Sequence, residues 1–212
     1  MDRFDANRRP IIYAIAMLAG FVDATGYLQA GGYFVSFMTG NTTLLALDVA
    51  NSSHRVLAPA SLIGGFVAGV AAGTWLGDRY AARRKRNILT AVSLLLLVAA
   101  AFRVIGETTL STAALVLAMG AANTAPSGNR TQGVGLTYMT GALVRLGQAL
   151  GERLGGSSPG EWRGFLLLWS SLLAGAVCGA VVTLHAPAWP LWIGAGMAAA
   201  LAVLAARLPA ET

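Results

Sequence analysis

The chain has 212 residues, of which 56% are hydrophobic and 11% are charged, and its mean hydropathy is +0.63. Soluble domains carry about 25% charged residues, so this composition excludes an ordinary soluble protein and predicts an integral membrane protein. The net charge of +6 does not predict nucleic-acid binding, because the Lys and Arg residues cluster beside apolar runs, where they determine membrane topology.

The first predicted membrane helix covers residues 11–28 and contains an acidic residue, Asp23. The charged segment MDRFDANRRP and the apolar run after it resemble a secretory signal, but no convincing small-x-small cleavage site followed by a soluble domain is present, so we expect an uncleaved helix. A carboxylate in a membrane helix costs about 2.5–3.5 kcal/mol on insertion scales. Asp23 is therefore predicted to face a polar interior as a proton or cation site. The alternative is a structural role, in which it lies near the outer interface or caps a neighbouring broken helix.

The next segment, 33–50, is apolar enough to enter the membrane but is interrupted within FVSFMTGNTT, residues 34–43. Gly40 permits a sharp turn, and the Thr39 hydroxyl or the Asn41 amide is expected to cap the helix that follows. Such a turn places unpaired amide groups inside the membrane, where irregular backbone is tolerated only if it is buried in protein or lines a water-filled cavity. A ligand site and a purely structural re-entrant turn both remain open.

Two further membrane helices are predicted at 57–77 and 88–105, joined by the most basic loop of the chain at 79–86. The positive-inside rule places this loop and the basic N-terminus in the cytoplasm, so two crossings fit before the loop and 33–50 is not expected to span. The helix at 57–77 carries small residues at every fourth position, which let helices approach closely within the chain or between copies. These residues are Ser61, Gly65, Gly69, Gly73 and Gly77.

The second half of the chain repeats this order. An apolar run at 110–125 contains Asn123, a second Met-Thr-Gly lies in 134–150, and apolar helices follow at 165–184 and 191–208. When the two copies are aligned, Gly20 and Asp23 match Gly120 and Asn123. The small-residue stripe recurs as Ser171, Gly175, Gly179 and Thr183.

These patterns predict one all-α membrane domain over 1–212, with internal repeats at about 10–106 and 109–208. Each repeat holds three membrane helices and one broken or re-entrant Met-Thr-Gly segment. Three crossings are an odd number, so the repeats are predicted to be inverted, with six helices and both termini in the cytoplasm. Inverted repeats are common among transporters. An eight-span arrangement is the alternative, although it fits the positive-inside rule less well.

The predicted binding site combines the two Thr-Gly turns with the polar residues inside the membrane. Helix N-termini from inverted halves are expected to meet near the midplane and to hold a polar or anionic solute on their amide groups, with Asp23 nearby for ion coupling. The predicted site residues are Asp23, Thr39, Gly40, Asn41, Asn123, Thr140 and Gly141.

No other chemistry is predicted. The single cysteine, Cys178, and the two histidines, His54 and His185, lack metal-ligand spacing, and the G-x-S-x-G match at 156–160 follows no predicted strand. We therefore expect no metal, no cofactor, no nucleic acid and no enzymatic activity. The expected partners are the lipid bilayer and a small solute, and a homo-oligomer remains open.

The block Gly20-Phe21-Val22-Asp23-Ala24, followed by FVSFMTGNT at 34–42, resembles the YoaK-like family of small bacterial membrane proteins of unknown function. The resemblance extends over nearly the whole chain. It implies a multi-pass protein of the bacterial cytoplasmic membrane with about six helices, and it brings no established substrate. Thr124 and Ala142 stand where the pattern leads us to expect Ala and Asn, so the two Thr-Gly sites are not predicted to be chemically equivalent.

Two functions follow as hypotheses. The first is a small-solute secondary transporter or permease, with ion or proton chemistry at the first Met-Thr-Gly copy because that copy has Asp23. The second is a non-transporting structural or regulatory membrane protein whose glycine stripes bind a partner.

Overall fold

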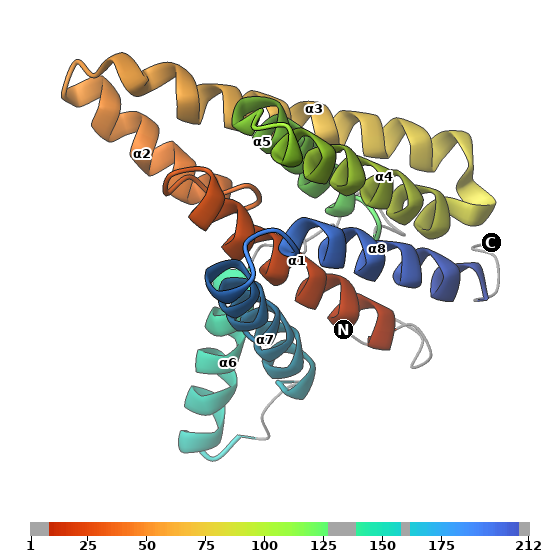
Figure 1. Ribbon diagram of the computed structural model, residues 1–212. Coiled ribbons are helices and arrows are strands. Elements are labelled where there is room, and N and C mark those ends of the chain that lie inside the picture. The colour runs from red at the N-terminus through yellow and green to blue at the C-terminus, as the bar shows by residue number, and fades with distance from the viewer. Residues whose placement is uncertain (1–8, 127–138, 158–161, 208–212) are drawn as a thin grey trace.

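A computed structural model describes residues 9–126, 139–157 and 162–207 of the chain, and within these ranges it contains helices and no strand (Figure 1). Two short 3-10 turns, His54–Val56 and Ala81–Arg83, precede the third and fourth α-helices. The α-helices are α1 Arg9–Gln29, α2 Met38–Ala50, α3 Leu57–Arg79, α4 Arg84–Val104, α5 Thr108–Ala122, α6 Met139–Leu154, α7 Arg163–His185 and α8 Pro190–Ala206.

All six predicted membrane segments form helices, and four of them have the length and composition to cross a bilayer. These four lie at Pro10–Gln29, His54–Arg79, Ala81–Val104 and Arg163–His185. The helices α5 and α8 are also apolar but shorter, with 15 and 17 residues. The described residues therefore form an all-helical structure with the features of a membrane protein.

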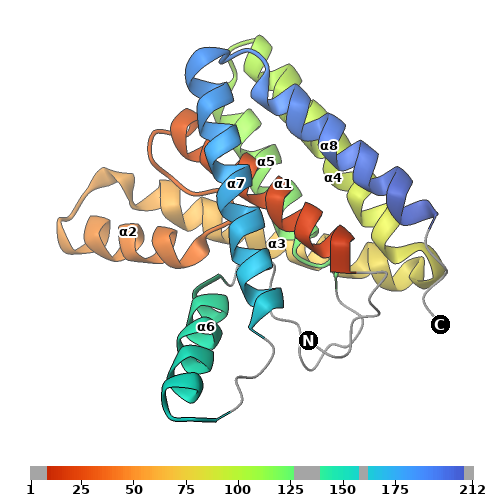
Figure 2. The ribbon, with the colours of Figure 1, turned by 90° about the horizontal axis from the view of Figure 1, so that it is seen from below.

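Each Met-Thr-Gly segment begins a short helix at its methionine. The helix α2 starts at Met38 and has 13 residues, and α6 starts at Met139 and has 16. At 1.5 Å per residue these helices are roughly 20 and 24 Å long, shorter than a hydrocarbon core of about 30 Å. Both helices extend away from the rest of the molecule, so that the Met-Thr-Gly turn is the inner end of each (Figures 1 and 2).

The hydrophobic core lies where α1, α4, α5 and α8 meet. In the view of Figure 2, α4 and α8 lie side by side. The helix α8 also packs against α1, and α4 packs against α5. The longer helices α3 and α7 pack on the outside of this group, α3 on α5 and α7 on α1. The largest fully buried side chains include Ile15, Leu18, Ile88, Leu89, Leu96, Leu115 and Met119.

The glycine stripes lie at contacts inside the chain. A methyl group added at Gly69 or Gly73 would overlap main-chain atoms of α5, and one at Gly175 or Gly179 would overlap main-chain atoms of α1. Gly65 faces the Val116 side chain of α5. Because close approach of two backbones requires residues without side chains, the stripes serve to pack the helices of one molecule, which the sequence left undecided.

Candidate functional site

The connection between α1 and α2 folds back along α1. The chain reverses after α1 at Gly31 and Gly32, which have φ angles of +70° and +92° that favour glycine. The N–H of Gly32 donates to the carbonyl of Tyr27 at 3.0 Å, which closes the end of the helix. Residues 33–37 then return beside the last turns of α1, and the buried Val35 side chain lies close enough to Gly26 that a methyl group there would clash.

Asp23 holds this returning segment from the side of α1. Its Oδ1 atom accepts the N–H of Val35 at 3.0 Å and the N–H of Ser36 at 2.8 Å. Non-helical backbone at membrane depth has no water to satisfy its polar groups, so such groups need partners from the protein. The carboxylate supplies partners to the main chain of Val35 and Ser36, which precede the N-cap residue Phe37, so Asp23 holds the connection between α1 and α2.

Asn41 holds the same segment from the side of α2. Its Oδ1 accepts the N–H of Phe34 at 3.0 Å, and its Nδ2 donates to the carbonyl of Phe34 at 2.7 Å. The Asn41 side chain has an exposed fraction of 0%. Asp23 and Asn41 thus satisfy three consecutive main-chain N–H groups, at positions 34 to 36, and we name residues 34–36 the clamped segment.

The prediction that Thr39 or Asn41 caps α2 is wrong. The N-cap residue is Phe37, and no side chain makes a cap hydrogen bond there. The Asn41 amide is already used by the main chain of Phe34, and the Thr39 side chain is exposed. The carbonyl of Thr39 accepts the hydroxyl of Thr43 at 3.3 Å, one turn further along α2.

The prediction of a sharp turn at Gly40 is wrong, because Gly40 lies in the first turn of α2 without a positive φ angle; its small size instead matters for packing. A methyl group at Gly40 would lie 2.8 Å from atoms of the Phe34 ring and 3.0 Å from the Phe37 ring. The Phe34 ring contacts Tyr27 and Phe37, with centroid distances of 4.8 and 5.5 Å. The Met-Thr-Gly turn therefore packs under an aromatic cluster that connects α1, the clamped segment and α2.

The second copy is described only in part. The Nδ2 of Asn123 donates to the carbonyl of Met119 in the same helix at 2.9 Å. Thr140 is exposed and Gly141 half-buried on the first turn of α6. Residues 127–138, which include Arg130 and the start of the second Met-Thr-Gly segment, lie outside the described residues.

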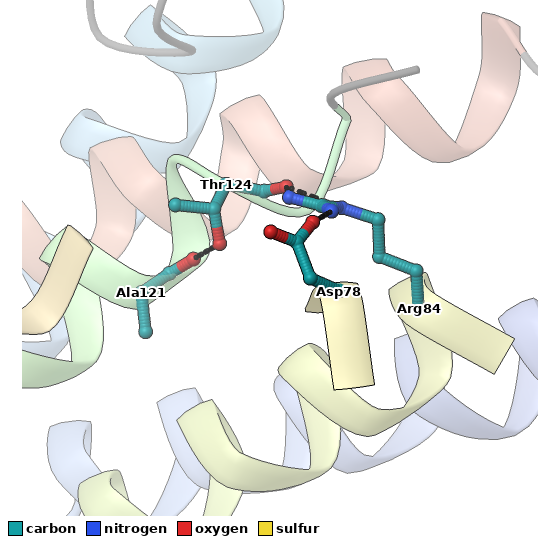
Figure 3. A network of polar contacts seen from close by, with 4 residues as sticks. All are labelled: Asp78, Arg84, Ala121 and Thr124. Atoms are coloured by element: carbon teal, nitrogen blue, oxygen red, sulfur yellow. Dashed lines mark hydrogen bonds and ion pairs between the residues drawn. The ribbon is translucent and has the colours of Figure 1, made fainter. Parts of the chain in front are cut away.

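A polar network that sequence reasoning missed connects the α3–α4 junction to the end of α5 (Figure 3). Nη1 of Arg84 lies 3.0 Å from Oδ1 of Asp78, and Nε and Nη2 of Arg84 each donate to the carbonyl of Thr124 at 3.4 Å. The Thr124 hydroxyl donates to the Ala121 carbonyl at 2.7 Å. Two residues in the sequence pointed to this network: Thr124, which departs from the family pattern, and Gly77 of the glycine stripe. In the structure, a methyl group at Gly77 would lie 2.7 Å from Cζ of Arg84.

A smaller polar contact joins α1 and α7. The hydroxyl oxygens of Thr25 and Thr183 lie 3.2 Å apart, and the Thr183 hydroxyl also donates to the Gly179 carbonyl at 2.7 Å. Thr25 is fully buried and Thr183 nearly so. The hydroxyls are thus satisfied inside the molecule.

Comparison with known proteins identifies relatives of this chain. A family model described as "Protein of unknown function (DUF1275)" matches residues 11–204. The chain is 37% identical over 200 residues to the UPF0700 transmembrane protein RA0705 of Rhizobium meliloti (strain 1021), covering 94% of this chain and 86% of the relative. It is 28% identical over 157 residues to the UPF0700 transmembrane protein YoaK of Bacillus subtilis (strain 168), covering 70% of each. No solved structure matches the chain.

Proposed function

Because this chain belongs to the DUF1275 family, as its YoaK-like sequence blocks predicted, we propose that it is a small-solute secondary transporter, or permease, of the bacterial cytoplasmic membrane. A membrane location follows from the relatives, which are transmembrane proteins, and from the four helices long and apolar enough to cross a bilayer. The transport activity and the orientation of the chain in the membrane are what we propose beyond that location.

The observation that carries the proposal is the matched packing of the two halves of the chain, α1–α4 and α5–α8. The helix α1 packs on α7 as α5 packs on α3, and α1 packs on α8 as α5 packs on α4. The helix α2 packs on α3 as α6 packs on α7, and α4 packs on α8. Exchange of the halves therefore turns the first pairs into one another and leaves the α4–α8 pair unchanged, so every pair remains in contact.

The same match holds for single residues. Gly20 faces the carbonyl of Leu172 on α7, and its counterpart Gly120 faces the carbonyl of Phe66 on α3. In the reverse direction, Gly175 faces the carbonyl of Met17, and Gly69 faces that of Leu117. Gly179 faces the main chain of Phe21, and its counterpart Gly73 faces the main chain of Ala121. Chance similarity between glycine-rich helices would not place the partner carbonyls in one register, so these contacts support an internal repeat.

We infer that the two halves are inserted in opposite directions. Each half holds three apolar helices, α1, α3 and α4 or α5, α7 and α8, and an odd number of crossings reverses the second half. The positive-inside rule then orients the molecule with the basic α3–α4 junction and both termini in the cytoplasm. Inverted repeats of this kind are typical of secondary transporters, in which one repeat moves against the other.

We place the solute site at the inner ends of α2 and α6. The N–H groups of Met38, Gly40 and Asn41 at the start of α2 already donate to main-chain carbonyls. The partial positive charge of a helix N-terminus is therefore the feature that favours a polar or anionic solute here. Thr39 and Thr140 are exposed on these first turns, next to Gly40 and Gly141. Asp23 and Asn41 hold the first of these turns through the clamped segment, and Asn123 occupies the place of Asp23 in the second half.

The alternative is a structural or regulatory membrane protein that does not transport a solute. Such a protein would have to bind its partner through a surface other than the glycine stripes. Gly69, Gly73, Gly175 and Gly179 are covered by α5 and α1 of the same molecule, so a partner helix cannot reach them without unpacking the core.

Reconstitution into proteoliposomes tests the transport proposal. The purified chain is inserted into vesicles that contain a pH-sensitive dye, and solute-driven proton flux is recorded for a panel of amino acids, organic acids, sugars and nucleobases. We expect at least one class to produce flux above protein-free vesicles, and Thr39→Val to reduce it. Signals equal to protein-free vesicles for every class, from protein with an intact unfolding transition, would overturn the proposal.

A further inference from the structure

The α3–α4 junction carries five basic residues and one acidic residue within ten positions, and the structure separates the basic residues into two groups. Arg84 is used by Asp78 and the Thr124 carbonyl, and Arg86 donates to Oδ1 of its neighbour Asn87 at 3.0 and 3.1 Å. Lys85 is buried, with 8% of its surface exposed. The remaining two, Arg79 at the end of α3 and Arg83 in the 3-10 turn that follows it, are exposed.

Two exposed aromatic residues accompany these arginines. Trp75 is 68% exposed and lies one helical turn before Arg79, on the same side of α3. Tyr80 is 50% exposed, and the guanidinium carbon of Arg79 lies 5.4 Å from the centroid of its ring. In membrane proteins Trp and Tyr collect at the level of the lipid headgroups, where one side of the ring is apolar and the other is wet. The aromatic pair therefore places Arg79 and Arg83 at headgroup level.

We propose that Trp75, Arg79, Tyr80 and Arg83 form a binding surface for the headgroup of an anionic phospholipid. The guanidinium group presents parallel N–H donors that match two phosphate oxygens. The exposed apolar side of α3, which includes Val67 and Trp75, offers a surface for the acyl chains of the same lipid. A zwitterionic lipid brings a positive group into a region that is already strongly basic, so charge complementarity favours a lipid with net negative charge. This surface is separate from the proposed solute site, and the inference does not depend on transport.

Native mass spectrometry of the full chain, released from a neutral detergent, tests this inference. The probes are phosphatidylglycerol and phosphatidylcholine, added separately over the same concentration range. The test variant is R79Q/R83Q. The matched control is R55Q, because Arg55 is also exposed but lies at the opposite end of α3. A second control is R84Q, because Arg84 points into the molecule.

We expect the wild-type chain to retain phosphatidylglycerol in preference to phosphatidylcholine. R79Q/R83Q should weaken phosphatidylglycerol retention by roughly fivefold for each arginine, the effect of one basic residue at an anionic surface. R55Q and R84Q should keep the preference, and Trp75→Leu should weaken retention of both lipids. An unchanged unfolding temperature of R79Q/R83Q is expected, because both side chains are exposed; the single variants R79Q and R83Q serve if the double variant is unstable.

Three results would overturn the inference. The first is equal retention of phosphatidylglycerol by wild type and R79Q/R83Q. The second is a loss of preference in R55Q as large as in R79Q/R83Q, which would indicate a general charge effect. The third is displacement of the lipid by inorganic phosphate alone, which would indicate a site for the free anion instead of a lipid.

Discussion

The side-chain amide of Asn41 pairs with both main-chain polar groups of Phe34, seven residues earlier in the chain, at 3.0 and 2.7 Å. This pair closes the clamped segment on the α2 side, as Asp23 closes it on the α1 side. The first Met-Thr-Gly turn is therefore fixed by side chains that satisfy backbone groups, and its rigidity can be tested directly.

Asn41→Leu should destabilise the protein, because it leaves the N–H and the carbonyl of the half-buried Phe34 without their side-chain partners. At about 1–3 kcal/mol for each unsatisfied group, the loss is roughly 2–6 kcal/mol. Chemical denaturation in detergent, followed by circular dichroism, measures it. Thr42→Val on the same turn is the control, because Thr42 is exposed and its hydroxyl bonds within α2. Equal stability of Asn41→Leu and Thr42→Val would show that the pair with Phe34 contributes nothing.

Two substitutions at Asp23 separate its structural role from ion chemistry. Asp23→Asn keeps an oxygen that can accept the N–H groups of Val35 and Ser36, so it should cost only about 1 kcal/mol, the difference between charge-assisted and neutral hydrogen bonds. Asp23→Leu removes the acceptor and should unfold at a clearly lower temperature. If Asp23 couples an ion to transport, Asp23→Asn should abolish gradient-driven flux while the protein stays folded. Flux equal to wild type in folded Asp23→Asn would restrict Asp23 to the structural role.

Glycine substitutions on α3 should differ sharply with position. Gly69→Ala places a methyl group against the Leu117 carbonyl of α5, and overpacking of this kind costs about 1–3 kcal/mol. Gly64 lies on the same helix with no atom within 4 Å of an added methyl group, so Gly64→Ala should be neutral or stabilising by about 0.5–1 kcal/mol. Thermal unfolding of the two variants makes the comparison. A Gly64→Ala variant as damaged as Gly69→Ala would contradict the packing of α3 on α5.

Arg84→Gln should destabilise the protein more than Asp78→Asn does. Asp78 is substantially exposed, so its ion pair with Arg84 is screened and contributes less than about 1 kcal/mol. Arg84 also donates to the Thr124 carbonyl, and this contact holds the end of α5. Arg86→Gln is the control, because Arg86 bonds to its own neighbour Asn87. The prediction fails if unfolding shows Asp78→Asn to be the more harmful change.

The proposed six-crossing topology predicts which loops share a side of the membrane. In a Cys178→Ser background, single cysteines at Ser53, Glu107 and Ala188 should react with an impermeant maleimide added outside intact cells. Cysteines at Ala82 and Ser157 should react only after the membrane is opened. Labelling of positions 53 and 107 from opposite sides would mean that the number of crossings between them is odd, which contradicts the inverted arrangement.

The sequence by itself determined where the helices are and which residues are unusual. The six apolar runs were readable because a membrane helix needs a continuous apolar stretch of about 20 residues. The helix starts at Met38 and Met139 were not, since we expected Thr39 or Asn41 to cap a helix that begins after the Met-Thr-Gly. The repeat of Gly20 and Asp23 as Gly120 and Asn123 was visible, since it is a property of order along the chain.

Only the tertiary structure decided what those residues contact. Asp23 meets the N–H groups of Val35 and Ser36 because the chain reverses at Gly31 and Gly32, and Arg84 meets Thr124, forty residues later, because α5 packs on α3 and α4. The glycine stripes face α5 and α1 of the same molecule instead of a partner. These outcomes depend on how whole helices pack and in which register. Side chains far apart in the chain set that register together, and no local sequence pattern encodes it.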